Sequence, residues 1–161
     1  MRVGIGYDLH RFRDPAEGVL RLGGVEVPGA PALLGHSDGD ALIHAIIDAI
    51  LGAAGEGDIG QHFPPGDPST RGIDSRELLK RVQRLVAARG FTVQNVDATV
   101  IAERPRLGPH IEAMRESIAV VLGVPHGRVN VKATTNEGVD ELGSGRALAA
   151  MAVALLEEDV P

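Results

Sequence analysis

The spacing of apolar residues along the chain predicts three main strands. The apolar-leaning opening, residues 1–7, is typical of extended chain, and the alternation over residues 91–101 is typical of a strand with one buried face. A change of phase at Asn95 indicates a bulge in that strand. Residues 129–133 form a further short apolar run, which we interpret as the third strand.

Four other segments indicate helices. Residues 40–54 are apolar around almost the whole helical circumference, and Asp38 is in position to cap this helix. Two amphipathic repeats, over residues 74–89 and 111–122, each stop at a glycine, which is the usual residue just beyond a helix end. The closing run, residues 147–156, is apolar and rich in alanine, and we interpret it as a fourth helix.

These elements follow one another in the order β, α, α, β, α, β, α. That order predicts an α+β fold in which a mixed sheet is covered on one face by helices. No repeat or low-complexity tract marks a boundary, so we expect a single domain over residues 1–161. Two connections stand out: residues 20–27 form a short extended piece broken by two glycines, and residues 55–73 form a Gly- and Pro-rich loop of a length typical of functional loops.

Composition narrows the possible functions. The chain has no Trp, one Tyr and three Phe, so its core must be aliphatic, and the aromatic platforms of single-strand nucleic-acid binders are scarcely available. Its formal net charge of -6 argues against a nucleic-acid partner, which needs a broad basic face. The first residues lack a signal-like stretch and no run is long enough to span a bilayer, so we expect a cytoplasmic protein with no membrane partner.

Histidines and carboxylates gather near the N-terminus in a pattern that indicates a metal site. Asp8 and His10 are two residues apart, so both side chains point to one side of an extended strand. In the predicted helix, Asp40, His44 and Asp48 recur every four residues and form a single polar stripe. Because the chain has no cysteine, a tightly held transition metal must be bound by imidazole and carboxylate. One carboxylate and two imidazoles with a fourth position open are typical of catalytic zinc.

Two of the carboxylates that lie between His10 and His44 in the sequence are suited to support these ligands. Asp38 and Asp40 are candidates to hydrogen-bond the histidines and orient them. The alternative is that His10 is a surface loop residue and His44 a hydrogen-bonded core histidine, because short His/Asp spacings arise often by chance. The spacing of these residues leaves both interpretations open.

Longer strings of sequence carry a more specific signal. They are GYDLHRF, LLGHSDGDALIHAIIDAILGAAGEGDIGQHFP, DSRELL, NVDATVIAERPRLGPH and the stretch from Arg128 to Glu137. Together they resemble the 2-C-methyl-D-erythritol 2,4-cyclodiphosphate synthases. The resemblance implies conversion of 4-diphosphocytidyl-2-C-methyl-D-erythritol 2-phosphate into the cyclic diphosphate with release of CMP, a step of non-mevalonate isoprenoid biosynthesis. It also implies a homotrimer with active sites between subunits.

The resemblance assigns roles to the residues of the predicted metal site and to three others. Asp8, His10 and His44 match the family's zinc ligands, one zinc ion per subunit. His36 and Thr135 match the two positions that stabilise the transition state. Glu137 matches the ligand of a second divalent ion, Mg²⁺ or Mn²⁺, that binds with the diphosphate.

Further positions match the family's substrate contacts. Those of the methylerythritol portion are Asp58, Ile59, Gly60, Phe63, Pro64, Pro65, Gly66 and Asp67. Further substrate-binding positions are Ser37, Thr134 and Asn136. Those of the cytidine pocket are Ala102, Glu103, Arg104, Pro105, Arg106, Leu107 and Gly108, and among them Arg106 is a candidate for contact with the diphosphate. Without the resemblance, this last segment is more simply a strand-to-helix connector with solvated arginines.

The match weakens after Glu137. Many family members continue with KLGFTGRGEG, in which an aromatic residue and an arginine approach the ligand. Counted without a gap, these positions are Glu141 and Ser144 here, so neither role carries over to them, nor to Leu142 or Arg146. A proposed isoprenoid-diphosphate site in the central channel of the related trimers is not carried over either.

Two other functions remain compatible with the same residues. A metal-dependent phosphohydrolase acting on a nucleoside diphosphate-type substrate would use zinc to activate water. A trimeric isoprenoid-binding or partner-binding protein would keep the site without turnover. The identity of the product separates these functions from the cyclisation.

Overall fold

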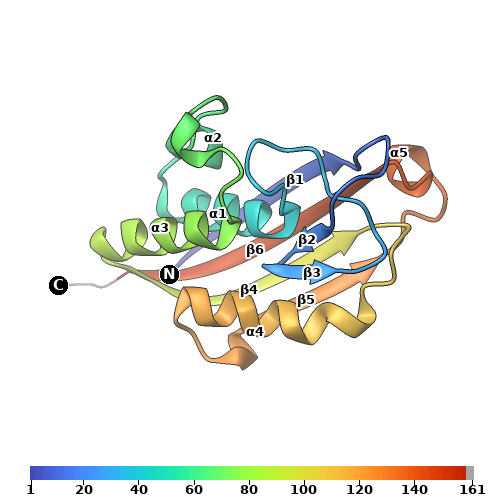
Figure 1. Cartoon of the computed structure of the whole chain (residues 1–161). Coiled ribbons are helices and arrows are strands. Elements are labelled where there is room, and N and C mark those ends of the chain that lie inside the picture. Colours follow the sequence, from blue (N-terminus) through green and yellow to red (C-terminus); the bar gives the residue numbers. More distant parts are fainter. Residues whose placement is uncertain (159–161) are drawn as a thin grey trace.

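The computed structural model describes residues 1–158 and consists of a four-stranded mixed sheet with helices packed on one face (Figure 1). The strand order is β1-β6-β4-β5. β6 is antiparallel to both of its neighbours, and β5 is parallel to β4. Consequently β1 and β5 lie at opposite edges of the sheet, and their carboxyl ends point the same way. The strands are β1 (Arg2–Arg11), β4 (Phe91–Ile101), β5 (Val129–Thr134) and β6 (Ala147–Glu158).

The long helices are those that the sequence pattern predicts before the last strand. They are α1 (Ala41–Ala54), α3 (Ser75–Ala88) and α4 (Ile111–Leu122). α1 is buried on nearly every side because it lies between the sheet and α3. Its cap is Asp40, whose side chain accepts a hydrogen bond from the backbone N–H of Ile43, so the prediction that Asp38 caps this helix is wrong.

Short elements complete the chain. The two glycines in residues 20–27 form the turn of a hairpin, and both have positive φ (60° and 76°), as a tight two-residue hairpin turn requires. The loop at residues 55–73 contains a short helix and a 3₁₀ turn. These elements are β2 (Leu20–Leu22), β3 (Val25–Val27), α2 (Ile59–His62), α5 (Asp140–Gly143), and 3₁₀ turns at Pro68–Thr70, Gly108–His110 and His126–Arg128.

The prediction of a closing helix is wrong, because residues 147–156 lie in β6, an inner strand of the sheet. β6 pairs along its length with β1 on one side and β4 on the other. An inner strand next to the core is apolar over long runs. Alanine favours helices, but the energy of this preference is small, so tertiary packing overrides it. The predicted bulge near Asn95 is confirmed by a shift of register between Val93 and Asn95.

The main aliphatic core lies between the sheet and its long helices. On the other face, a small cluster of Leu142, Ala147 and Ala149 covers the end near α5, and much of the rest of that face is exposed. On that face β1 and β6 expose large apolar side chains, which is unusual for a surface that remains in water. They are Val3, Ile5, Tyr7, Leu9, Met151 and Val153, with Val3 67% and Ile5 66% exposed. None of the helices in the described residues is long and apolar enough to cross a membrane.

Candidate active site

Asp8 and His10 of β1 meet His44 of α1 at one point. Asp8 Oδ2 lies 2.8 Å from His10 Nε2 and 3.0 Å from His44 Nδ1, and the two ring nitrogens are 3.3 Å apart. One carboxylate oxygen and two imidazole nitrogens therefore converge, as a catalytic metal centre with an open position requires.

The other nitrogen of each imidazole is held by the protein. The Nδ1–H of His10 donates to the backbone carbonyl of Leu34, and His44 Nε2 lies 3.0 Å from the hydroxyls of Ser37 and Ser75. Such bonds fix the ring orientation and direct the free lone pair of each ring toward the shared point. The donor set suits zinc, because imidazole nitrogen and carboxylate oxygen are both common ligands of that ion.

Two glycines of β1 bring His44 to the strand. A Cβ atom at Gly4 would lie 2.1 Å from the carbonyl oxygen of Ala49, and one at Gly6 would lie 1.9 Å from that of Ala45. Only glycine therefore lets the main chain of α1 lie directly on β1. This contact places His44, the residue before Ala45, beside Asp8.

Interactions within the triad lower the pKa of Asp8 and raise the pKa of His10. Burial by itself raises the pKa of Asp8, but hydrogen bonds from His10 and His44 outweigh it and bring that pKa to about 2. Burial likewise lowers the pKa of His10, but the Asp8 carboxylate more than compensates and raises it above the ordinary 6.5. At a pH below its raised pKa, His10 thus forms a carboxylate–imidazolium pair with Asp8, and a bound metal ion would replace the proton of that pair.

Neither of the two carboxylates expected to orient the histidines hydrogen-bonds an imidazole directly. Asp40 is fully buried and accepts hydrogen bonds from the backbone N–H groups of Gly23 and Gly24 at 2.9 and 2.7 Å, so it ties the hairpin turn to α1 rather than touching an imidazole. Asp38 reaches His44 only through Ser75, which the sequence analysis missed. The signal for Ser75 was limited to its place in the string DSRELL, 31 residues from His44.

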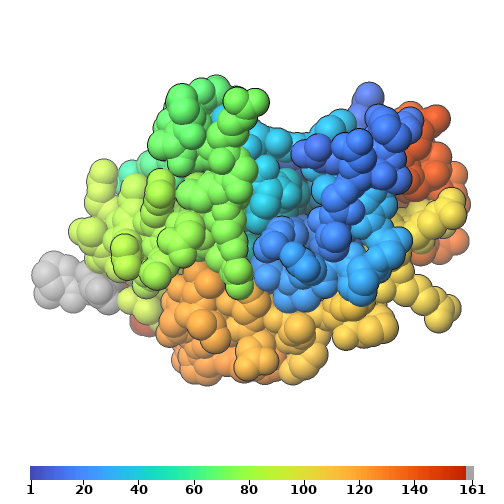
Figure 2. Space-filling view, viewed as in Figure 1, coloured from blue at the N-terminus to red at the C-terminus, as the bar shows by residue number. Residues whose placement is uncertain are grey.

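The segments predicted to bind the methylerythritol portion lie beside α1. Asp48, the last member of the polar stripe, accepts a hydrogen bond from Ile59 N–H at 2.8 Å, and Asp58 caps α2. His36 Nε2 lies 2.9 Å from the carbonyl oxygen of Asp67. In Figure 2 a hollow separates the green segment that carries α2 from the blue segment that follows β1, with cyan atoms at its floor. These contacts join α2 and the following loop to the helix that carries His44.

The remaining predicted residues gather at the other edge of the sheet. Thr134 ends β5 and residues 135–137 follow it, while Ala102–Gly108 follows the neighbouring β4, with Ala102 N–H bonded to the carbonyl of Thr134. Three strand spacings, roughly 14 Å, separate β5 from β1. The structure therefore groups the predicted site residues in two halves, named here for their predicted roles: the metal half at β1 and α1, and the nucleotide half at the ends of β4 and β5.

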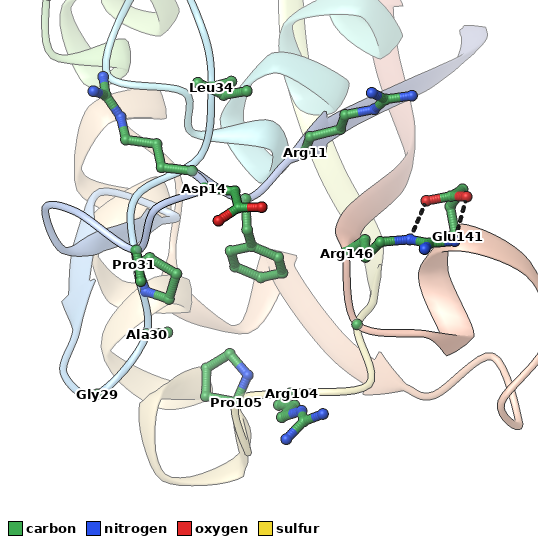
Figure 3. Close-up of a pocket in the computed structure, with 14 residues that line it drawn as sticks. Arg11, Asp14, Gly29, Ala30, Pro31, Leu34, Arg104, Pro105, Glu141 and Arg146 are labelled. Atoms are coloured by element: carbon green, nitrogen blue, oxygen red, sulfur yellow. Dashed lines mark hydrogen bonds and ion pairs between the residues drawn. The ribbon is translucent and has the colours of Figure 1, made fainter.

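A cavity of ≈ 830 Å³ lies between the end of β1 and the Arg104–Pro105 segment, and the metal triad is not part of its lining (Figure 3). Leu34, whose carbonyl contacts His10, lines one wall, and Arg104 and Pro105 line another. Glu141 and Arg146, to which the sequence assigned no role, form a two-pronged ion pair at its margin with N–O distances of 2.6 and 2.7 Å. This volume lies within the range of small-molecule sites.

The fold and this centre define an α+β protein with a candidate His₂Asp metal site beside a nucleotide-sized cavity. The model of the YgbB family matches residues 1–157. A 2-C-methyl-D-erythritol 2,4-cyclodiphosphate synthase from Gloeobacter violaceus is 57% identical over 158 residues, which cover 98% of this chain and 96% of that protein. The chain belongs to the YgbB family, that of the 2-C-methyl-D-erythritol 2,4-cyclodiphosphate synthases, which confirms the resemblance.

Solved structures agree with this assignment. A CDP-bound 2C-methyl-D-erythritol-2,4-cyclodiphosphate synthase is 39% identical, with a TM-score of 0.87 over 97% of this chain and 100% of that one. The bifunctional IspDF of Campylobacter jejuni is also 39% identical, with a TM-score of 0.93 over 98% of this chain but 42% of that longer one. The fold described above is therefore shared by relatives with and without an additional region.

Proposed function

We propose that this chain, as a single catalytic domain over residues 1–161, converts 4-diphosphocytidyl-2-C-methyl-D-erythritol 2-phosphate into 2-C-methyl-D-erythritol 2,4-cyclodiphosphate and CMP. Residues 159–161 lie outside the described part of the chain. The observation that carries the proposal is the convergence of Asp8, His10 and His44, each imidazole held from behind, in a member of a family of such synthases. The CDP bound to a relative of the same fold supports a cytidine diphosphate substrate.

The reaction exchanges one phosphorus–oxygen bond for another. An oxygen of the 2-phosphate attacks the distal phosphorus of the diphosphate, and the bond from that phosphorus to the oxygen of CMP breaks. Nucleophile and electrophile are both anionic, so they repel each other before the new bond forms. Asp8, His10 and His44 would hold Zn²⁺, and Glu137 would hold Mg²⁺ or Mn²⁺ together with the diphosphate; the positive charge of these ions would offset this repulsion.

The other residues hold the substrate in its folded conformation. We assign the methylerythritol portion to Asp58–Gly60 and the loop Phe63–Asp67, and the base to Ala102–Gly108. His36 and Thr135 stabilise the transition state. The ring of His36 is held by the Asp67 carbonyl, so its position depends on the loop that binds substrate. Bringing the two phosphates together supplies the proximity on which an intramolecular reaction depends.

We further propose a cytoplasmic homotrimer in which neighbouring chains complete each site. Two observations support this arrangement. The metal half and the nucleotide half lie at opposite edges of one chain's sheet, so chains placed side by side can bring the metal half of one chain to the nucleotide half of the next. The exposed apolar face, made by β1 and β6, provides a surface that burial against other copies would stabilise.

Phosphorus NMR tests the reaction directly. Purified protein is incubated with the cytidylyl substrate, Zn²⁺ and Mg²⁺, beside a chelated control. We expect a cyclic diphosphate and CMP, both lost on chelation. A linear diphosphate or free phosphate would show the phosphohydrolase instead, and unchanged substrate at every metal loading would show a binding protein.

A further inference from the structure

We propose that Ser75 is the positioning residue that fixes the tautomer and orientation of His44 and connects this metal ligand to Asp38. The inference rests on the proposed metal site and adds a residue to it. Ser75 is the first residue of α3 and is fully buried. Its Oγ lies 3.0 Å from His44 Nε2 and 2.5 Å from Asp38 Oδ1.

The donors and acceptors in this chain of contacts assign the proton positions. Asp38 accepts from the backbone N–H of Ser75 at 3.0 Å and from that of Asp40 at 3.1 Å, so it takes the role of an acceptor. The Ser75 hydroxyl therefore donates to Asp38, and its oxygen accepts from His44 Nε2–H. With Nε2 protonated, the lone pair of His44 Nδ1 would be available to a metal ion, in place of the hydrogen bond that joins Nδ1 to Asp8 Oδ2 at 3.0 Å.

Ser37 alone does not determine this arrangement. Its Oγ is also 3.0 Å from His44 Nε2, but the other contacts of that oxygen are longer: 3.4 Å from the N–H of Gly39 and 3.4 Å from Ser75 Oγ. Because no carboxylate takes its proton in these contacts, the Ser37 hydroxyl is able to donate to His44 or to accept from it. Ser75 has its hydroxyl proton committed to Asp38, so it selects one tautomer.

The same contacts connect the metal half to α3. Asp38 N–H donates to the carbonyl of Ile73, two residues before Ser75, so the start of α3 is joined to Asp38 by backbone and side chain. Removing a residue that orients a metal-bound histidine reduces metal affinity roughly 10- to 100-fold. Ser75 is therefore expected to control how tightly the site holds its ion.

The test measures zinc affinity rather than turnover, by competition with a chromophoric chelator. Ser75→Ala and Asp38→Asn should each raise the zinc dissociation constant roughly 10- to 100-fold, and the double variant should be little weaker than either. Thr70→Ala removes another buried hydroxyl from the preceding segment, where it contacts Asp67, and should leave the constant unchanged. An unchanged constant for Ser75→Ala, or a double effect equal to the product of the single effects, would overturn the proposal.

Two further measurements separate the possible failures. If wild-type protein binds no zinc, the proposed metal site fails and this assignment fails with it. If Ser75→Ala does not fold, as circular dichroism would show, nitrogen-15 NMR of the His44 ring in wild-type protein decides. In the zinc-loaded protein, a proton on His44 Nε2 supports the assignment, and a ring with no proton on Nε2 refutes it.

Discussion

The metal half and the nucleotide half of the proposed site are built differently. In the metal half, α1 is buried and lies directly on Gly4 and Gly6, and both imidazoles are held by the protein on the side away from the shared point. The nucleotide half is exposed where it follows β5, and there Glu137 and Asp140 have positive φ values of 52° and 61°. Non-glycine residues in this conformation are strained by about 1–3 kcal/mol and tend to occur at functional sites.

This difference indicates that a single chain preforms the geometry of only one half of the proposed site, the metal half. The metal half obtains its geometry from its own core, so we expect it to bind its ion in a single chain. The exposed residues that follow β5 lack such support, which fits a segment that acts against a neighbouring chain and its substrate. The following predictions test that division, beginning with the largest expected effect.

Replacing His44 by Ala should abolish zinc binding and reduce kcat about 10³-fold or more, because charge stabilisation by a metal contributes several kcal/mol. Steady-state kinetics and metal analysis check both effects. The nucleotide half should be unaffected, so CDP titration should still detect the segment Ala102–Gly108. Full activity of metal-free His44→Ala protein would refute the role given to this residue.

Mixing two inactive variants should restore activity if neighbouring chains share each site. His44→Ala damages the metal half and Glu137→Ala the nucleotide half. After unfolding and refolding as an equal mixture, about a quarter of the sites should combine two intact halves, as random assembly into a closed ring requires. The mixture should therefore greatly exceed either variant alone. No recovery from a mixture shown to contain hybrid oligomers would place both halves in one chain.

Gly6→Ala should destabilise the metal half selectively. Its Cβ would lie 1.9 Å from a main-chain oxygen of α1, so the helix must shift, at a cost of about 3 kcal/mol or more in unfolding free energy. Denaturant unfolding and zinc titration should show lower stability and weaker zinc binding. Gly127→Ala, before β5, is the matched control: an added Cβ there meets open space, and the change should stay within about 0.5 kcal/mol.

The smallest expected effect is the change in unfolding free energy with pH that Asp8 and His10 cause. The pKa of Asp8 is lowered from 3.8 to about 2, so its contribution is complete above pH 3.8 and is lost as pH falls toward 2. The pKa of His10 is raised above 6.5, so its contribution is complete below 6.5 and is lost as pH rises through the raised value. Thermal unfolding of chelated protein should therefore show this contribution, at most about 2 kcal/mol for Asp8, between roughly pH 4 and 6.5.

Bound zinc should have the opposite pH dependence, because the ion takes the place of the His10 proton and therefore binds better as pH rises. Zinc-dependent stabilisation should increase with pH across the range in which His10 loses its proton. Zinc stabilisation that is constant from pH 5 to pH 8 would contradict the carboxylate–imidazolium pair. The same scan on His44→Ala protein is the control, since it lacks the zinc effect.

The periodicity of apolar and polar residues predicted the features that depend on a single helix or strand. The triad was predictable because Asp8 and His10 share a strand face and His44 stands on the one polar stripe of an apolar helix. α1, α3, α4 and the strands β1, β4 and β5 follow from periodicity in the same way. Their positions in the sheet required the structure, since only the structure shows that β1 and β5 lie on opposite edges.

Contacts between distant segments were not predictable. β6 was interpreted as a helix because an apolar, alanine-rich run carries no sign of its two strand neighbours. Ser75 gave no signal for the same reason: its partners Asp38 and His44 are more than 30 residues away. Asp40 belongs to the predicted polar stripe, but its position in three dimensions makes it a structural carboxylate bound to the hairpin turn.

The contact of Gly4 and Gly6 with α1 also has an evolutionary consequence. A side chain that grows in a core is often accommodated when a neighbouring side chain becomes smaller. Gly4 and Gly6 face main-chain atoms of α1, which every amino acid carries, so no second substitution can make room. A lineage that lost either glycine would have to move the helix, and the helix carries His44. These two positions are therefore closed to gradual exchange for as long as selection maintains the metal centre.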